Sequence, residues 1–510
     1  MTNHFPALLI VVPLMAAPIC LFLRKQWLVR IWAVLVAWTC LYFAWTMLNQ
    51  IVGGIDTPIR YAMGGWQMPL GIELSIDAAN AFIVLIITGI ASVVFPFGIG
   101  CKGLAGPEGK EHLFYAALLL CMCGLMGIAV TGDVFNVFVF LEITSLSSYA
   151  LISMGRKRQA LMAAYSYLIM GTIGGTFILV GIGFLYAATG SLNMADIAVI
   201  LPKVIADPKG VTTAVVAFGF LGVGVGIKLA IFPLYQWLPN AYTYAPSKVS
   251  AFLSATATKV SYYVLLRLIF TLFGVGFVFK TLGVQKVLLP MSIVAMFLGS
   301  LAAIYQTNVK RLLAYSSVAQ IGYMTLGLCL LQFDGNTIVN HDGLTGGIAH
   351  LFNHAIMKCG LFLIVGCVIY RMGSTTISDM KGFAFRMPCT FAAFVVAGLS
   401  IIGVPGTVGF ISKWYLVLGA LAGGHYLVAA LILLSSLLAV VYIWKIVEVG
   451  YFQKPEEPIK KCEAPLSMLV PVWILMVAAI YFGFATELTG GVAETAAKAL
   501  LGSHLPGAVQ

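Results

Sequence analysis

Residues 218–252 read FGFLGVGVGIKLAIFPLYQWLPNAYTYAPSKVSAF. The stretch is apolar enough for a membrane helix, yet it contains Lys228 and then Pro233, Pro239 and Pro246. Proline lacks a backbone donor, so this helix cannot satisfy all of its backbone groups internally. A lysine at mid-membrane costs at least about 2.5 kcal/mol unless it has a partner or a wet cavity. The stretch therefore predicts a broken membrane helix with a buried lysine beside the break, as in transporters.

The composition of the whole chain is strongly apolar. Of its 510 residues, 61% are hydrophobic and 9% charged, and the mean hydropathy is +1.01. Soluble domains carry about 25% charged residues. Recurring apolar runs of about 18 residues or more predict an all-α polytopic membrane protein with about 14 spanning helices, forming one membrane domain over residues 1–510. The candidate spans are 6–23, 31–52, 78–100, 112–130, 134–154, 161–189, 213–236, 247–272, 285–304, 312–332, 344–370, 388–422, 426–449 and 466–485.

The sequence lacks the usual signatures of cofactor chemistry. Its ten cysteines form no CxxC pair and no Cys/His cluster with metal-site spacing, so we expect no metal. It has no GxxxxGK[ST] loop, and no GxGxxG follows a strand pattern, so ATP and dinucleotides are not expected ligands. We therefore predict no cofactor, and the energy for any transport must come from an ion gradient or from partner proteins.

The loop cations divide unevenly between the two sides of the predicted bundle. Seventeen lie on one side and six on the other, so the positive-inside rule places the first side in the cytoplasm. An even number of spans then puts both termini on the outer side of the cell membrane. Topology explains the net charge of +11, and nucleic acid is not an expected partner. The seventeen are Arg24, Lys25, Arg30, Lys102, Lys110, Arg156, Lys157, Arg158, Lys248, Lys310, Arg311, Arg371, Lys381, Arg386, Lys454, Lys460 and Lys461.

A carboxylate and a second lysine lie inside other predicted spans. Residues 134–154 place Glu142 near mid-span, where we expect it to be buried in the bundle, either as a structural ion pair or, as we favour, as a switchable partner of Lys228. Lys259 is then a second relay station, or else a lysine held by neighbouring hydroxyls and carbonyls. Arg267 and Lys445 lie near span ends and are expected to extend to the membrane surface.

The segment HLFNHAIMK places three ionisable residues on one helical face. His350, His354 and Lys358 stand at i, i+4 and i+8. A metal site is disfavoured because no nearby acid or cysteine completes a ligand set and the lysine would repel a cation. A proton path suits the stripe better, since histidine titrates near neutral pH. A pair of structural buried histidines is the alternative.

A second broken helix is predicted within residues 388–422. Pro405 and Gly406 interrupt the apolar run, and Lys413 follows, 185 residues after Lys228. The repetition of this device suggests two related units of about five spans each, over residues 112–272 and 285–449.

Taken together, these segments closely resemble the antiporter-like family shared by Mrp-type cation/proton antiporters, respiratory complex I and membrane-bound hydrogenases. The resemblance covers the third to thirteenth spans and, within the family, is greatest to the D-type subunits of Mrp antiporters. It rests on FLEITSLSSYAL, GIKLAIFPLYQWLPNAYTYAPSKVSAFL, NVKRLLAYSSVAQIGYM, HLFNHAIMK and VPGTVGFISKW.

The resemblance implies two inverted five-helix repeats with helices 7 and 12 broken, and proton half-channels joined by a charged axis at mid-membrane. It implies that Glu142 lies on the fifth helix, Lys228 on the broken seventh, Lys259 on the eighth, the two histidines on the eleventh and Lys413 on the broken twelfth. One type of complex I subunit typically carries glutamate at this last position, which disfavours that type.

These features predict a proton-translocating subunit of a multi-subunit Na⁺/H⁺ antiporter, which works with other membrane subunits and is not an enzyme by itself. The alternative is a proton-pumping membrane-arm subunit of a complex I-like or membrane-bound hydrogenase complex. A purely structural bundle gives no reason to retain so many intramembrane charges. The residues expected to transfer protons are Glu142, Lys228, Lys259, His350, His354 and Lys413, with Lys358 as an additional relay.

Overall fold

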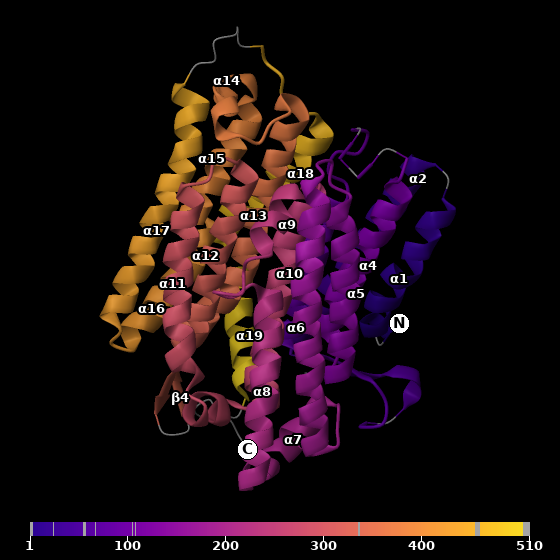
Figure 1. Ribbon diagram of the computed structural model, residues 1–510, viewed down its shortest axis with the longest axis vertical. Helices are drawn as coiled ribbons and strands as arrows, with labels where there is room; N and C mark the ends of the chain where they lie inside the picture. Colours follow the sequence, from indigo (N-terminus) through magenta and orange to yellow (C-terminus); the bar gives the residue numbers. More distant parts are fainter. Residues whose placement is uncertain are drawn as a thin grey trace.

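The computed structural model is a bundle of long helices that run side by side, with short strands at its lower end (Figure 1). It describes residues 4–23, 25–54, 58–66, 68–101, 103–104, 106–107, 109–334, 337–453 and 460–502. The N-terminal part comprises α1 (Phe5–Phe22), α2 (Gln26–Val52), the antiparallel pair β1 (Ile59–Ala62) and β2 (Glu73–Ile76), and α3 (Ala78–Val94).

Two groups of helices follow within the predicted repeat boundaries; their inverted relation stays a prediction. The first comprises α4 (Glu111–Val130), α5 (Val134–Ser153), α6 (Gln159–Thr189), α7 (Met194–Ile205), α8 (Pro208–Leu229), α9 (Leu238–Tyr244) and α10 (Ser247–Arg267). The second comprises α11 (Val284–Ile304), α12 (Val309–Cys329), β3 (Gln332–Asp334), β4 (Thr337–Asn340), α13 (Asp342–Met372), α14 (Phe383–Arg386), α15 (Pro388–Ile402), α16 (Val408–Ala422) and α17 (Tyr426–Val447). The chain continues through α18 (Leu466–Phe484) and α19 (Val492–Leu501).

The predicted helical, multi-span class is confirmed. Twelve helices in the described part of the chain are long and apolar enough to cross a membrane. The apolar helix α3 has 17 residues, and the predicted span 388–422 is divided between α15 and α16. These two additions are compatible with the predicted number of about 14.

Both predicted helix breaks are present. α8 stops at Leu229 because Ala230 adopts a left-handed φ of +60°. The connection returns to α9 past Trp237, whose indole Nε1 donates to the carbonyl of Ile227 at 2.9 Å. α15 stops before Gly403, at φ +89°, a backbone conformation that favours glycine.

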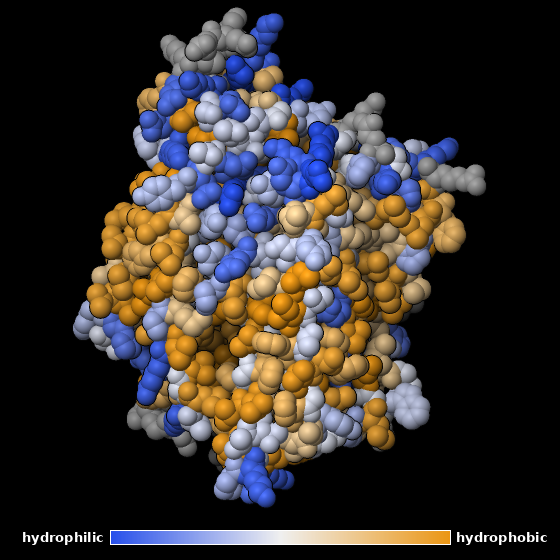
Figure 2. Space-filling view, in the orientation of Figure 1, coloured by the Kyte–Doolittle hydropathy of each residue, from blue (hydrophilic) through white to orange (hydrophobic). Residues whose placement is uncertain are grey.

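The centre of the bundle is formed by α10, α12 and α13, which are almost wholly buried by the other helices. The surrounding helices α6, α8, α17 and α18 present apolar side chains outward. Figure 2 shows this as an orange belt across the middle of the visible face, with hydrophilic residues gathered at the upper end. The ionisable residues on α10 and α13 are therefore enclosed by protein.

One end of the bundle, which we call the basic end, carries the connections that follow α5, α13 and α17 (top in Figure 1). Lys248 and Lys310, predicted as loop cations, are instead buried near the starts of α10 and α12. They were misplaced because both helices begin at these basic residues without a preceding polar loop. Three further predicted loop cations lie outside the described residues: Arg24, Lys102 and Lys454.

Candidate functional site

Glu142 on α5 and Lys228 on α8 form an ion pair across two helices. The lysine Nζ lies 3.3 Å from Glu142 Oε1 and donates to the hydroxyl of Ser145 at 2.6 Å. The Lys228 side chain is 4% exposed and that of Glu142 26% exposed. The expectation that Glu142 is buried within this chain is therefore wrong, because one side of the carboxylate faces outward between α5 and its neighbours.

The space for the Glu142 carboxylate is provided by a glycine on α6. A Cβ atom built on Gly175 would overlap Glu142 Oε1, so any larger residue forces the carboxylate to move. Gly183, two turns along the same helix, has no neighbouring atom in the corresponding position. Gly175 thus sets the position of the carboxylate relative to Lys228, a role that the sequence did not reveal.

Lys259 is buried at the centre of α10. Its Nζ donates to the carbonyl oxygen of Ser254 and lies 3.4 Å from the hydroxyl of Thr258. This is the geometry of the alternative left open by the sequence, a lysine held by carbonyls and hydroxyls. Because these partners are neutral, nothing in the contact fixes the lysine in its charged form.

The two histidines on α13 stack on each other as their i, i+4 spacing predicts. Their ring centroids are 5.7 Å apart with an interplanar angle of 12°. His350 Nε2 contacts Gln320 Oε1 on α12 and Nδ1 contacts Ser412 Oγ on α16, both at 2.8 Å. The amide oxygen only accepts, so Nε2 carries a proton; in the neutral ring, Nδ1 then accepts from the serine.

His354 and Lys358 continue this stripe deeper into the bundle. Both ring nitrogens of His354 are buried and have no hydrogen-bond partner among the described residues. Lys358 Nζ donates to the carbonyl of Leu313 at 2.8 Å. Buried polar groups are nearly always satisfied by protein or by water, so the His354 ring marks a place where water completes the hydrogen bonding.

Lys413 on α16 occupies the second helix break without a carboxylate partner in the described part of the chain. Its Nζ donates to the carbonyls of Ile401 and Ile402 at 2.9 and 2.8 Å, at the end of α15. The ammonium also lies 5.1 Å from the ring centroid of Tyr323, whose ring is 5.9 Å from that of His350. Lys413 is thus connected to the histidines through an aromatic ring.

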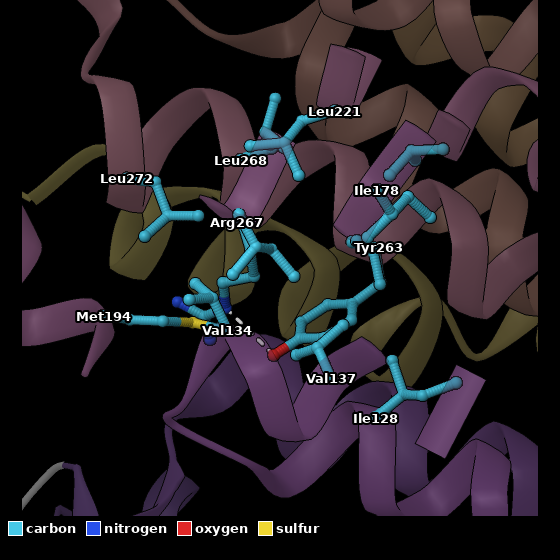
Figure 3. Close-up of a pocket in the computed structure, with 13 residues that line it drawn as sticks. Ile128, Val134, Val137, Ile178, Met194, Leu221, Tyr263, Arg267, Leu268 and Leu272 are labelled. Atoms are coloured by element: carbon cyan, nitrogen blue, oxygen red, sulfur yellow. Dashed lines mark hydrogen bonds between the residues drawn. The ribbon is translucent and has the colours of Figure 1, made fainter. Parts of the chain in front are cut away.

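An apolar cavity of about 30 Å³ lies between α5, α6, α8 and α10, on the side of the ion pair away from the basic end (Figure 3). Its walls include Val137 and Leu221, and the Tyr263 hydroxyl at its edge accepts a hydrogen bond from Arg267 Nε at 3.0 Å. A space this small and apolar holds no stable water chain. On this side the ion pair is therefore walled off from water.

Arg267 does not extend to the membrane surface as expected. Its guanidinium donates to Asp77 and Asn80 at the start of α3, and its side chain is only 12% exposed. Asp77 also caps α3, so one carboxylate supports both a helix terminus and an arginine. Lys445 likewise turns inward, donating to the carbonyls of Ile304 and Gln306 at 2.9 and 3.0 Å.

The comparisons with known proteins agree with this arrangement. Residues 131–439 match the family model described as NADH:quinone oxidoreductase/Mrp antiporter, TM. The chain is 42% identical to the N subunit of the NADH-quinone oxidoreductase of Desulforudis audaxviator, with 96% of this chain and 97% of the relative covered. It is 28% identical to the D-type subunit of the Na⁺/H⁺ antiporter of Bacillus subtilis, with 98% and 97% covered.

A solved structure is similar over nearly the whole chain. It is a chain of the membrane-bound sulfane sulfur reductase, an archaeal respiratory membrane complex, with 29% identity, a TM-score of 0.86 and 97% of both chains covered. The predicted resemblance is thereby confirmed, and with it a multi-pass membrane location. The chain belongs to the NADH:quinone oxidoreductase/Mrp antiporter family of membrane subunits.

Proposed function

We propose that this chain moves protons across the membrane as one subunit of a larger complex, using Glu142 and Lys228 as a switchable ion pair. The observation that carries the proposal is the 3.3 Å contact between these side chains beside a helix break. A carboxylate stabilises the neighbouring ammonium, and a buried ammonium that loses its carboxylate is favoured to release its proton. Opening and closing the pair thus converts a movement of Glu142 into release and uptake of a proton at Lys228.

The released proton has a series of acceptors across the centre of the bundle. Lys259 on α10 is held by neutral partners, and the His354 and His350 rings follow on α13. Lys413 at the second break is the exit-side group, and Lys358 is an additional relay. Water around His354 would join stations that do not touch directly.

Other membrane subunits are the partners that this mechanism needs. The outward-facing side of Glu142 would be in lipid if the chain were alone, at a cost that a neighbouring subunit or its water removes. A neighbour that approaches or leaves this side would also change the charge environment of the pair. The relatives named as subunits are consistent with such an assembly.

Exchange of Na⁺ for H⁺ is our first proposal for the coupled process. It is supported by the relative named as a Na⁺/H⁺ antiporter subunit, which matches this chain over nearly its full length. In this form, protons and Na⁺ are the transported ions, and the Na⁺ site lies in another subunit.

A second candidate is the proton-pumping membrane arm of a redox complex. It is supported by the 42% identity to a subunit of an NADH-quinone oxidoreductase and by the structural match to a respiratory membrane complex. In this form, electron transfer in other subunits would open and close the ion pair, and this chain would still carry only protons.

The two candidates are separated by purifying the tagged chain from its native membrane and identifying its partners by mass spectrometry. The purified complex is then reconstituted in liposomes containing a pH-sensitive dye. Small antiporter subunits together with Na⁺-driven proton movement support the first candidate. Iron–sulfur or hydrogenase-like subunits together with donor-driven proton movement support the second, and proton movement under neither condition contradicts the proposed function.

A further inference from the structure

A water-accessible vestibule opens at the basic end, directly over the junction of α9 and α10. It has a volume of about 390 Å³ and is lined by the chain from Thr243 to Ser247 and by the ends of α5, α12 and α13. Arg156, Lys157 and Lys310 line it, and none of its described lining residues is acidic. The vestibule therefore carries positive charge at the mouth of the first half of the bundle.

Lys310 separates this vestibule from the interior of α10. Its Nζ donates to the carbonyl of Ala245 at 2.7 Å and to the hydroxyl of Ser250 at 3.1 Å. Ser250 passes the contact on by donating to the carbonyl of Tyr242 at 2.8 Å. The side chain comes from α12 in the second group of helices, yet its ammonium fills the junction between two helices of the first group.

Beyond Lys310, hydroxyl groups follow one face of α10 inward. Ser247, Ser250, Ser254 and Thr258 are spaced by three, four and four residues, so they lie along a single stripe, and all four are buried. The stripe begins at the vestibule and ends at Lys259, whose Nζ contacts Ser254 and Thr258. On the far side of the ion pair, by contrast, the walls are apolar.

We propose that Lys310 is a relay and selectivity residue for proton access: it passes protons from the vestibule to the α10 hydroxyl stripe that leads to Lys259, and it excludes metal cations. This inference rests on the proposed function, because it names where protons enter the bundle. Lys310 donates a proton toward Ser250, the hydroxyl passes its own proton inward, and water in the vestibule returns a proton to the lysine.

The exclusion of metal cations follows from charge and chemistry. A metal ion has to pass close to the ammonium of Lys310 in a narrow protein-lined passage, where charge repulsion is weakly screened. A proton does not have to pass it, since lysine exchanges one of its own protons for the incoming one. A lysine in this position thus distinguishes the two ions, whereas a neutral side chain would not.

The test measures access to the stripe without requiring transport. Cysteine replaces Ser254 below Lys310 or Ser247 above it, in the intact complex, with Cys389 and Cys462 changed to serine because they are the partly or fully exposed native cysteines of the described chain. Ag⁺ is added from the basic end, and modification of each cysteine is quantified by peptide mass spectrometry. The same experiment is repeated with Lys310→Ala and Lys310→Arg.

We expect Ser247→Cys to react at the same rate in all three backgrounds. Ser254→Cys should be protected with lysine or arginine at position 310 and should react at least about tenfold faster in Lys310→Ala. Equal reactivity of Ser254→Cys in all backgrounds, or reaction only from the opposite end, overturns the inference.

Partner copurification and an unchanged Ser247→Cys rate show that the variants are folded. A purely structural role for Lys310 predicts changes at both cysteines. Because Ag⁺ access does not depend on ion transport, a failure of the proposed function leaves this result interpretable.

Discussion

The two broken helices hold their lysines in different ways. Lys228 lies before the first break and meets Glu142 on another helix, whereas Lys413 lies after the second break and rests on the carbonyls of Ile401 and Ile402. The first lysine therefore has a charged partner that can move away, while the second has fixed neutral partners. The comparison suggests that the first break is where charge is switched and the second where a proton is passed on.

The largest expected effect separates the two lysines by stability. Lys228→Met and Lys413→Met should both abolish proton movement in liposomes, since each removes a station. Lys228→Met also leaves a partly buried carboxylate without its cation, which should cost roughly 2 kcal/mol, less than a fully buried pair because Glu142 is 26% exposed. Lys413→Met removes only hydrogen bonds to carbonyls, worth about 1 kcal/mol.

The thermal unfolding midpoints of the two purified complexes provide the measurement. A midpoint that is lower for Lys228→Met than for Lys413→Met is the expected order. Equal midpoints would remove the energetic distinction between the two breaks.

The next effect tests the geometry of the ion pair through a residue that carries no charge. Gly175→Ala places a methyl group where Glu142 Oε1 now lies, so the carboxylate has to move relative to Lys228. We expect the proton transport rate to fall at least about tenfold, because small displacements of reacting groups are costly. Gly183→Ala on the same helix, which meets open space, is the matched control and should transport normally. Similar rates for the two variants would show that the position of Glu142 is not critical.

A smaller effect is expected at the second break, where neutral groups position the relay. Ser412→Ala removes one hydrogen bond to His350 Nδ1, worth about 1 kcal/mol, so transport should slow roughly fivefold. Ser153→Ala is a suitable control, because that hydroxyl bonds only to the carbonyl of Ala150 in its own helix. A Ser412→Ala rate equal to that of the control would indicate that the tautomer of His350 is not set by this contact.

The fold and the ionisable stations were largely predictable from the sequence. Membrane helices are encoded locally by long apolar runs, and a charge such as Glu142 or Lys228 within one of them is conspicuous because it is costly. The breaks were predictable for the same reason, since proline and glycine interrupt an otherwise apolar run. The i, i+4 spacing of His350 and His354 also placed their rings together, as the structure confirms.

The neutral partners of these stations were not predictable. Ser145 is 83 residues from Lys228, and Gln320 and Ser412 are 30 and 62 residues from His350, so only the packing of helices brings them together. Lys310 was misplaced because its position at the start of a helix looks like a loop in a hydropathy profile. Arg267 was misplaced because its carboxylate partner, Asp77, lies 190 residues away.

The central claim is that Glu142 takes part in proton movement because of its place beside Lys228. The most direct measurement compares Glu142→Gln with Glu448→Gln in the same reconstituted complex, using dye-reported proton movement driven by the gradient or donor that the copurified partners indicate. Glu448 is exposed near the basic end of α17 and has no place in the relay. The account predicts background proton movement for Glu142→Gln and a normal rate for Glu448→Gln. A normal rate for Glu142→Gln, in a complex that retains all its subunits, would contradict it.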